Sequence, residues 1–81
     1  GNLMNISKNE ALKEIRLAAK KAGLVFKQTN TTLNGAYLYK LEVRKTGDVV
    51  MSNYRFWSAY ADTCNGFIAS WDGSTFIAGL R

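Results

Sequence analysis

Residues 52–71, SNYRFWSAYADTCNGFIASW, decide the fold of this chain because they predict its longest amphipathic helix. Their apolar side chains recur in steps of three, four and seven, which is the spacing of one helical face. That face comprises Trp57, Tyr60, Ala61, Cys64, Phe67, Ile68 and Trp71. Each aromatic ring buries roughly 150 to 250 Å², so we expect this face to form the floor of the core, with Ser52 or Asn53 as the N-cap.

Asn65-Gly66 interrupts the pattern, because an internal glycine costs a helix about 1 kcal/mol relative to alanine. An alternative therefore stays open, in which the helix ends at Cys64 and residues 67–71 pair with residues 74–80 across a turn at Asp72-Gly73. We interpret Cys64 as a small core hydrophobe. Asp62 is expected to be a surface charge.

A second helix is predicted nearer the N-terminus, where Ser7-Lys8-Asn9-Glu10 has the pattern of a capping box. This helix is expected to run to about Ala22 and to end at Gly23. Its narrow apolar face is rich in alanine and comprises Ala11, Leu12, Ile15, Ala18, Ala19 and Ala22. A basic row occupies the opposite face and comprises Lys13, Arg16 and Lys20.

Asn34-Gly35 lies between two alternating segments and predicts a two-residue β-hairpin. That loop would set Phe26 opposite Val43 and Lys27 opposite Glu42. A further strand follows the loop at residues 45–47. The predicted elements are therefore a helix, three strands and a helix, over residues 7–22, 24–33, 36–44, 48–52 and 52–71. We expect an α+β fold in the order α-β-β-β-α, in which both helices pack on one face of an antiparallel three-stranded meander.

The composition indicates a single basic domain over residues 1–81, with a net charge of +5. Residues 1–6 are expected to be flexible, with residues 1–3 as a cloning remnant, and residues 74–81 to be a tail that docks as a short extra strand. The sequence has no apolar run long enough to span a membrane. Because its N-terminus is polar, we expect no secretory leader. One cysteine excludes an intramolecular disulfide, so a cytoplasmic protein is expected.

Few residues in the sequence can support catalysis or hold a metal. There is no histidine, a single cysteine and no close set of carboxylates, so a zinc, calcium or other metal site is not expected. Nucleophilic catalysis needs an activated group and a base that orients it, and the sequence offers no such pair. We expect a protein that acts by binding, without enzymatic activity, cofactor or small-molecule substrate.

The positive charge favours nucleic acid as the partner. The candidate phosphate contacts are the basic row and Arg55, which lies in the first turn of the second predicted helix; helix N-termini attract anions. The alternative is a host protein bound on the open face of the sheet. The candidate contacts for a protein are Leu17, Leu38, Lys40 and Arg44. A third possibility is a structural homodimer formed through a free sheet edge.

The helix-meander-helix order is similar to that of double-stranded-RNA-binding domains, across nearly the whole chain. In that family a basic cluster opens the second helix and grips phosphates, and the equivalent residues 53–57 of this sequence contain Arg55. The family's first hairpin usually carries Gly-Pro and a histidine, whereas this sequence has Asn34-Gly35. The resemblance therefore lies in topology rather than in motif.

Three segments also resemble short uncharacterised proteins encoded by bacteriophages and prophages. They are EALKEIRLAAKKAGLVFK (residues 10–27), YLYKLEVRKTGDVVMSN (residues 37–53) and FWSAYADTCNGFIASWDGSTF (residues 56–76). The resemblance implies a small accessory protein in a bacterial cytosol. Such proteins often bind and block a host factor, including nucleases of host defence.

Overall fold

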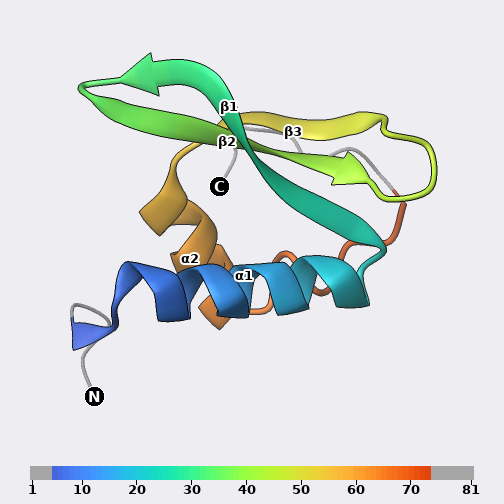
Figure 1. Cartoon of the computed structure of the whole chain (residues 1–81). Helices are drawn as coiled ribbons and strands as arrows, with labels where there is room; N and C mark the ends of the chain where they lie inside the picture. The colour runs from blue at the N-terminus through green and yellow to red at the C-terminus, as the bar shows by residue number, and fades with distance from the viewer. Residues whose placement is uncertain (1–4, 74–81) are drawn as a thin grey trace.

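The described part of the chain, residues 5–73 of a computed structural model, has the predicted order of helix, three strands and helix. The elements are α1 (Lys8–Lys21), β1 (Leu24–Leu33), β2 (Ala36–Val43), β3 (Val49–Tyr54) and α2 (Phe56–Cys64). The strands form one antiparallel sheet in the order β1-β2-β3. Both helices lie on the same side of this sheet (Figure 1), which confirms the α+β prediction.

Helix α1 begins and ends as its sequence predicts. The Ser7 hydroxyl accepts a hydrogen bond from the Glu10 backbone N–H at 3.1 Å and donates one to Glu10 Oε1 at 3.0 Å. The helix ends where Gly23 adopts φ +76°, a left-handed conformation that favours glycine. Its predicted apolar face is confirmed, because Ala11, Ile15, Ala18 and Ala19 are buried and Leu12 and Ala22 are half-buried.

The β1–β2 hairpin turns at Asn34-Gly35, whose φ angles of 53° and 82° suit a type I′ turn. Next to the turn the predicted register is correct, with Leu33 opposite Ala36. A β-bulge between Gln28 and Thr32 then shifts the pairing, so that Phe26 lies opposite Leu41 and Lys27 opposite Lys40. The predicted partners, Val43 and Glu42, are therefore wrong by two residues. An even shift preserves the face on which each side chain lies.

Strand β3 is longer and less regular than predicted. Leu41 pairs with Met51, β3 continues to Tyr54, and the register shifts on both sides of Leu41. These irregularities break the alternation of side chains, and Val50 and Met51 both belong to the core. Asn53 has φ 54°, so it forms a bend inside β3 rather than a helix cap.

Helix α2 is much shorter than the predicted helix over residues 52–71. Its N-cap is Arg55, without a side-chain capping bond, and it ends at Cys64. Gly66 then takes φ 82°, and residues 65–70 form turns. The continuous helix was therefore wrong, and the alternative helix end was correct. The strand proposed for residues 67–71 is absent from the described chain, and its partner at residues 74–80 lies outside the described residues, as does the tail.

The buried face of α2 is rotated relative to the prediction. Phe56, Ala59 and Tyr60 are buried, whereas Ala61 and Cys64 are exposed and Trp57 is 50% exposed. Cys64 is therefore not a core residue. Asp62 is not a surface charge, because it is buried and accepts a hydrogen bond from the Tyr54 hydroxyl. Phe56 rather than Trp57 therefore lies against the sheet.

An aromatic cluster joins the sheet to α2. Phe26 and Tyr39 stack with ring centroids 4.5 Å apart and an interplanar angle of 2°. Tyr54 meets the edge of Phe26 at 6.3 Å, and Phe56 contacts Tyr39 at 5.6 Å. Aromatic pairs contribute about 0.5–1.5 kcal/mol each beyond the area they bury. The cluster therefore fixes which face of α2 meets the strands.

Alanine substitutions at two neighbouring positions test this rotation. We expect Phe56→Ala to reduce the free energy of unfolding by about 3–5 kcal/mol, because it leaves a cavity in the core. Trp57→Ala should cost clearly less, because half of that side chain is already in water. Urea denaturation measures both, and loss of any unfolding transition in Phe56→Ala counts as the same result. A larger loss at Trp57 than at Phe56 would contradict the described face of α2.

Candidate nucleic-acid interface

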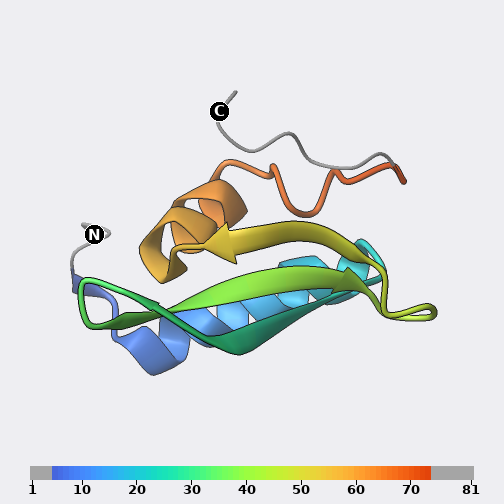
Figure 2. The ribbon, with the colours of Figure 1, turned by 90° about the horizontal axis from the view of Figure 1, so that it is seen from above.

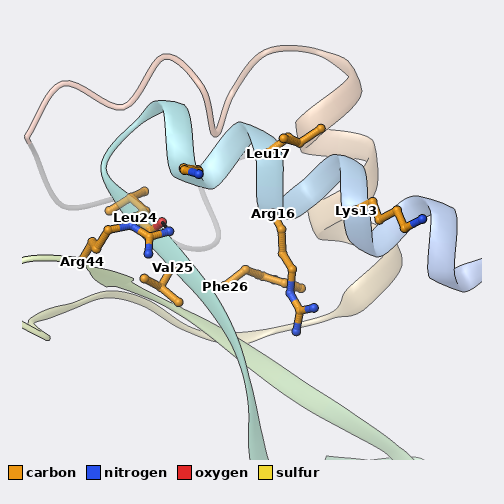
Figure 3. A pocket seen from close by; sticks show the side chains of 8 residues that line it. Lys13, Arg16, Leu17, Leu24, Val25, Phe26 and Arg44 are labelled. Atoms are coloured by element: carbon orange, nitrogen blue, oxygen red, sulfur yellow. Dashed lines mark hydrogen bonds between the residues drawn. The ribbon is translucent and has the colours of Figure 1, made fainter.

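A groove of about 410 Å³ runs between α1 and the neighbouring strand β1. Four cationic side chains line it: Lys13, Arg16 and Lys20 from α1, and Arg44, which follows β2. No acidic side chain is part of the lining. Figure 3 shows the Arg16 side chain reaching from α1 toward the strand beside Phe26, while Lys13 extends outward along the helix. We call this feature the basic groove.

The remaining lining of the basic groove is apolar and comprises Leu17, Leu24, Val25 and Phe26. Strand β1 is an edge of the sheet. Because the Arg44 N–H donates to the Gly23 carbonyl at 2.9 Å, the antiparallel alternation turns the backbone groups of Leu24 and Phe26 outward. The Arg44 guanidinium contacts the Leu24 carbonyl at 3.4 Å, which holds Arg44 at one end of the groove.

Charges are separated between the two flanks of α1. The basic row lies on the flank next to β1, whereas Glu10 and Glu14 lie toward Tyr60 of α2. A side-chain hydrogen bond with Cys64, burial, and the negative charges of Glu14 and Glu10 raise the pKa of Tyr60 above its ordinary value. The cations of the basic groove therefore lie on one side of α1, and Glu10 and Glu14 lie on another.

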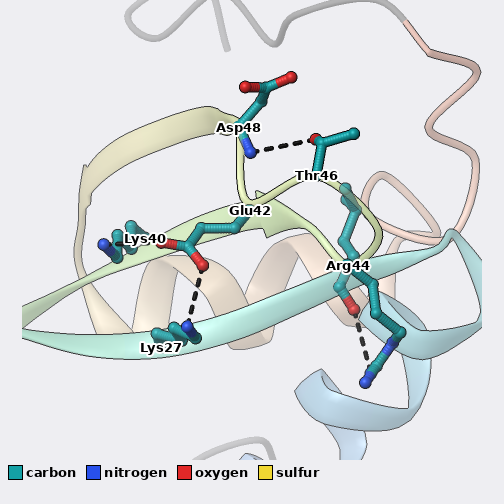
Figure 4. A network of polar contacts seen from close by, with 7 residues as sticks. Lys27, Lys40, Glu42, Arg44, Thr46 and Asp48 are labelled. Carbon is teal, nitrogen blue, oxygen red and sulfur yellow. Dashed lines mark hydrogen bonds and ion pairs between the residues drawn. The ribbon is translucent and has the colours of Figure 1, made fainter.

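The cations of the basic groove form no ion pair within residues 5–73, where the ion pairs present both belong to Glu42. Lys40 contacts Glu42 at 2.7 Å and Lys27 contacts it at 3.0 Å (Figure 4). Hydrogen bonds from Lys40 and Lys27 lower the pKa of the Glu42 carboxyl. Glu42 thus offsets one of the two lysine charges on the open face of the sheet, whereas no acidic side chain lines the basic groove.

The predicted protein-binding residues do not form one surface. Leu38 is only 7% exposed, and it lies opposite the bulge in β1, where the Thr29 hydroxyl donates to its carbonyl at 2.8 Å. Lys40 is paired with Glu42. Leu17, exposed as predicted at 57%, lines the basic groove together with Arg44. The structure therefore does not bring the four residues together on the open face, and Leu17 and Arg44 line the basic groove with the predicted phosphate contacts Lys13, Arg16 and Lys20.

Arg55 lies away from the basic row, at a second hollow of about 430 Å³. This hollow is bounded by Lys8 at the start of α1, by the β1–β2 turn and by residues 55–58. Tyr37 and Trp57 line it with about half of each side chain exposed. We call it the aromatic hollow. Sequence reasoning missed Lys8, Tyr37 and Trp57, because the alternation of β2 and the periodicity of α2 directed both aromatic rings inward.

Two further classes of site are absent from the described part of the chain. Residues 5–73 contain no group of three or more histidine, cysteine, aspartate or glutamate side chains placed to hold a metal ion. Over the same residues, neither helix is long and apolar enough to cross a membrane.

Comparison with known proteins adds no family. The chain matches no family model, no curated protein and no solved structure.

The Glu42 ion pairs predict a pH-dependent stability. The pKa of a glutamate in an unfolded chain is about 4.3. Because the folded pKa lies lower, the ionised carboxylate stabilises the fold above that pH, and this contribution is lost as the pH falls through the folded pKa. We therefore expect Glu42→Gln to be less stable than the parent at pH 7, with a gap that narrows toward pH 3.

Urea denaturation at several pH values measures this gap. Glu14→Gln is the matched control, because Glu14 is exposed and forms no ion pair within the described residues. It should show little difference from the parent at either pH. A gap for Glu42→Gln that is the same at pH 3 and pH 7 would contradict the assigned ion pairs.

Proposed function

We propose that the protein acts by binding nucleic acid, with the phosphate backbone held along the basic groove. The observation that carries the proposal is the convergence of Lys13, Arg16, Lys20 and Arg44 on one groove with no acidic side chain in its lining. Contacts from lysine and arginine to phosphate release condensed counterions, and this release supplies most of the affinity in non-specific binding. The net charge of +5 adds long-range attraction toward a polyanion.

The spacing of the basic row suits a phosphate backbone. Seven residues separate Lys13 from Lys20, which is roughly 10 Å along the helix axis at about 1.5 Å per residue. One strand of a duplex presents a phosphate about every 3.4 Å of its axis, so this length of helix passes about three phosphates. Arg16 lies between the two lysines and can reach the middle of such a run.

A pair of charge-matched variants tests the proposal. We expect Lys13→Gln/Arg16→Gln to weaken binding to a generic labelled oligonucleotide at low salt. It should also reduce the slope of log affinity against log salt by about two, since two phosphate contacts are lost. The control, Lys21→Gln/Lys45→Gln, removes the same charge from exposed positions outside the groove and should keep the parent slope.

Fluorescence anisotropy at 50 and 200 mM salt gives both quantities. If the parent protein binds neither single-stranded nor duplex oligonucleotide at tens of micromolar in 50 mM salt, the proposal fails. If both double variants reduce the slope of log affinity against log salt equally, the effect is one of general charge and the basic groove is not the binding site.

A second candidate is an acidic segment of a host protein, bound in the same groove. The apolar floor formed by Leu17, Leu24 and Val25, beside β1 as an edge strand of the sheet in residues 5–73, favours an extended peptide that adds a strand to the sheet. Phage-encoded accessory proteins, which the sequence resembles, can act on either kind of partner. A competition experiment separates the two candidates. If an acidic protein binds the chain and an oligonucleotide does not displace it, the result favours the peptide.

A further inference from the structure

We propose that the aromatic hollow binds an unpaired nucleotide, with its base stacked against Trp57 and Tyr37 and its phosphate held by Lys8 and Arg55. This inference rests on the proposed function and deepens it. It assigns the chain a second subsite, and it names single-stranded nucleic acid as the preferred partner class.

The exposure of the two rings is the first observation. Phe26, Tyr39, Tyr54, Phe56 and Tyr60 are all buried, whereas Trp57 is 50% exposed and Tyr37 is 51% exposed, and both line the same hollow. Trp57 is also held in place, since Phe56 and Tyr60 pack against it edge-to-face at 5.0 and 5.9 Å. A fixed, half-exposed indole is a suitable platform for a base, because every base has a π-face.

The charge around the hollow is the second observation. Lys8 and Arg55 line it, and no acidic side chain does. The Lys8 ammonium lies 5.1 Å from the centroid of the Phe56 ring, within the range of a cation–π contact, and this contact positions it at the wall of the hollow. Arg55 forms no ion pair within the described residues. Aromatic rings beside unneutralised cations complement a ligand that has both a π-surface and a negative charge, as a nucleotide does.

The hollow and the basic groove are connected by α1. Lys8 and Lys13 are five residues apart, roughly 7.5 Å along the helix axis and about 140° apart around it, so the two sites lie on different sides of α1. A strand that reaches the hollow meets exposed rings beside the cations Lys8 and Arg55. Bases in a duplex are held inside the stack and reach such rings only after unpairing, which costs a few kcal/mol. A single strand needs no unpairing and is expected to bind more tightly.

The test compares one pyrimidine-rich single strand with the duplex of the same sequence, by anisotropy in 50 mM salt. We expect the parent to bind the single strand more tightly. Trp57→Ala and Tyr37→Ala should each weaken single-strand binding by roughly five- to 150-fold, the range for loss of one stacked base, while duplex affinity stays unchanged. Val49→Ala, an exposed apolar position outside the hollow, is the control and should bind like the parent.

Intrinsic tryptophan fluorescence gives a second readout. It does not require that Trp57→Ala folds. The single strand should quench the tryptophan emission of the parent. Trp57→Phe keeps a ring for stacking, so it should retain most of the affinity but lose that quenching, because only Trp71 then emits. Quenching that persists in Trp57→Phe overturns the assignment of Trp57.

The outcomes distinguish the two proposals. If Trp57→Ala and Tyr37→Ala bind the single strand like the parent while Lys13→Gln/Arg16→Gln does not, the stacking subsite is wrong and the basic groove stands. Equal affinity of the parent for single strand and duplex also overturns the subsite. If the parent binds neither oligonucleotide, the proposed function itself is wrong.

Discussion

The stacked pair of Phe26 and Tyr39 is the contact on which the rest of the structure depends. It joins neighbouring strands on the helix side of the sheet, and Tyr54 and Phe56 close around it. An 81-residue chain buries only a modest share of its unfolded surface, so a few large rings supply much of its core. Once Phe56 lies against that stack, the next residue of the helix must point about 100° away. Trp57 is therefore half in water.

The two surface features follow from the same packing. Alanines on the inner face of α1 let the helix approach the sheet closely, with Ile15 fully buried between them. Figure 2 shows α1 lying beneath β1 and β2, with α2 beside β3. The flank of α1 nearest the sheet edge then carries the basic row, which lies next to strand β1. The outward turn of Trp57 places an aromatic ring at the far end of the same helix, next to Lys8.

Local sequence signals predicted the elements better than the surfaces. The capping pattern at Ser7, the left-handed Gly23 and the Asn34-Gly35 turn act over a few residues, and each was correct. The β1 bulge and the irregular β3 pairing depend on how whole strands fit together, and no local pattern encodes them. Leu38, predicted to contact a protein from the open face, is buried in this arrangement.

The helix over residues 52–71 failed for a related reason. Its periodicity was counted through Asn65-Gly66, which instead ends α2, and its start was placed before the bend at Asn53. The basic row was predictable because it lies on a regular helix. Its union with Leu17 and Arg44, and the separate position of Arg55, depend on packing between elements far apart in the sequence.

Titration of the ¹⁵N-labelled protein with a short single-stranded oligonucleotide, followed by two-dimensional NMR, tests the central claim most directly. That claim is that the cationic surface made up of the aromatic hollow and the basic groove receives the partner. The account predicts that the perturbed amides and the shifted indole N–H of Trp57 map onto that surface, while Lys27, Lys40 and Val49 on the sheet stay unchanged. Perturbations confined to the sheet, with α1 and Trp57 unaffected, would contradict it.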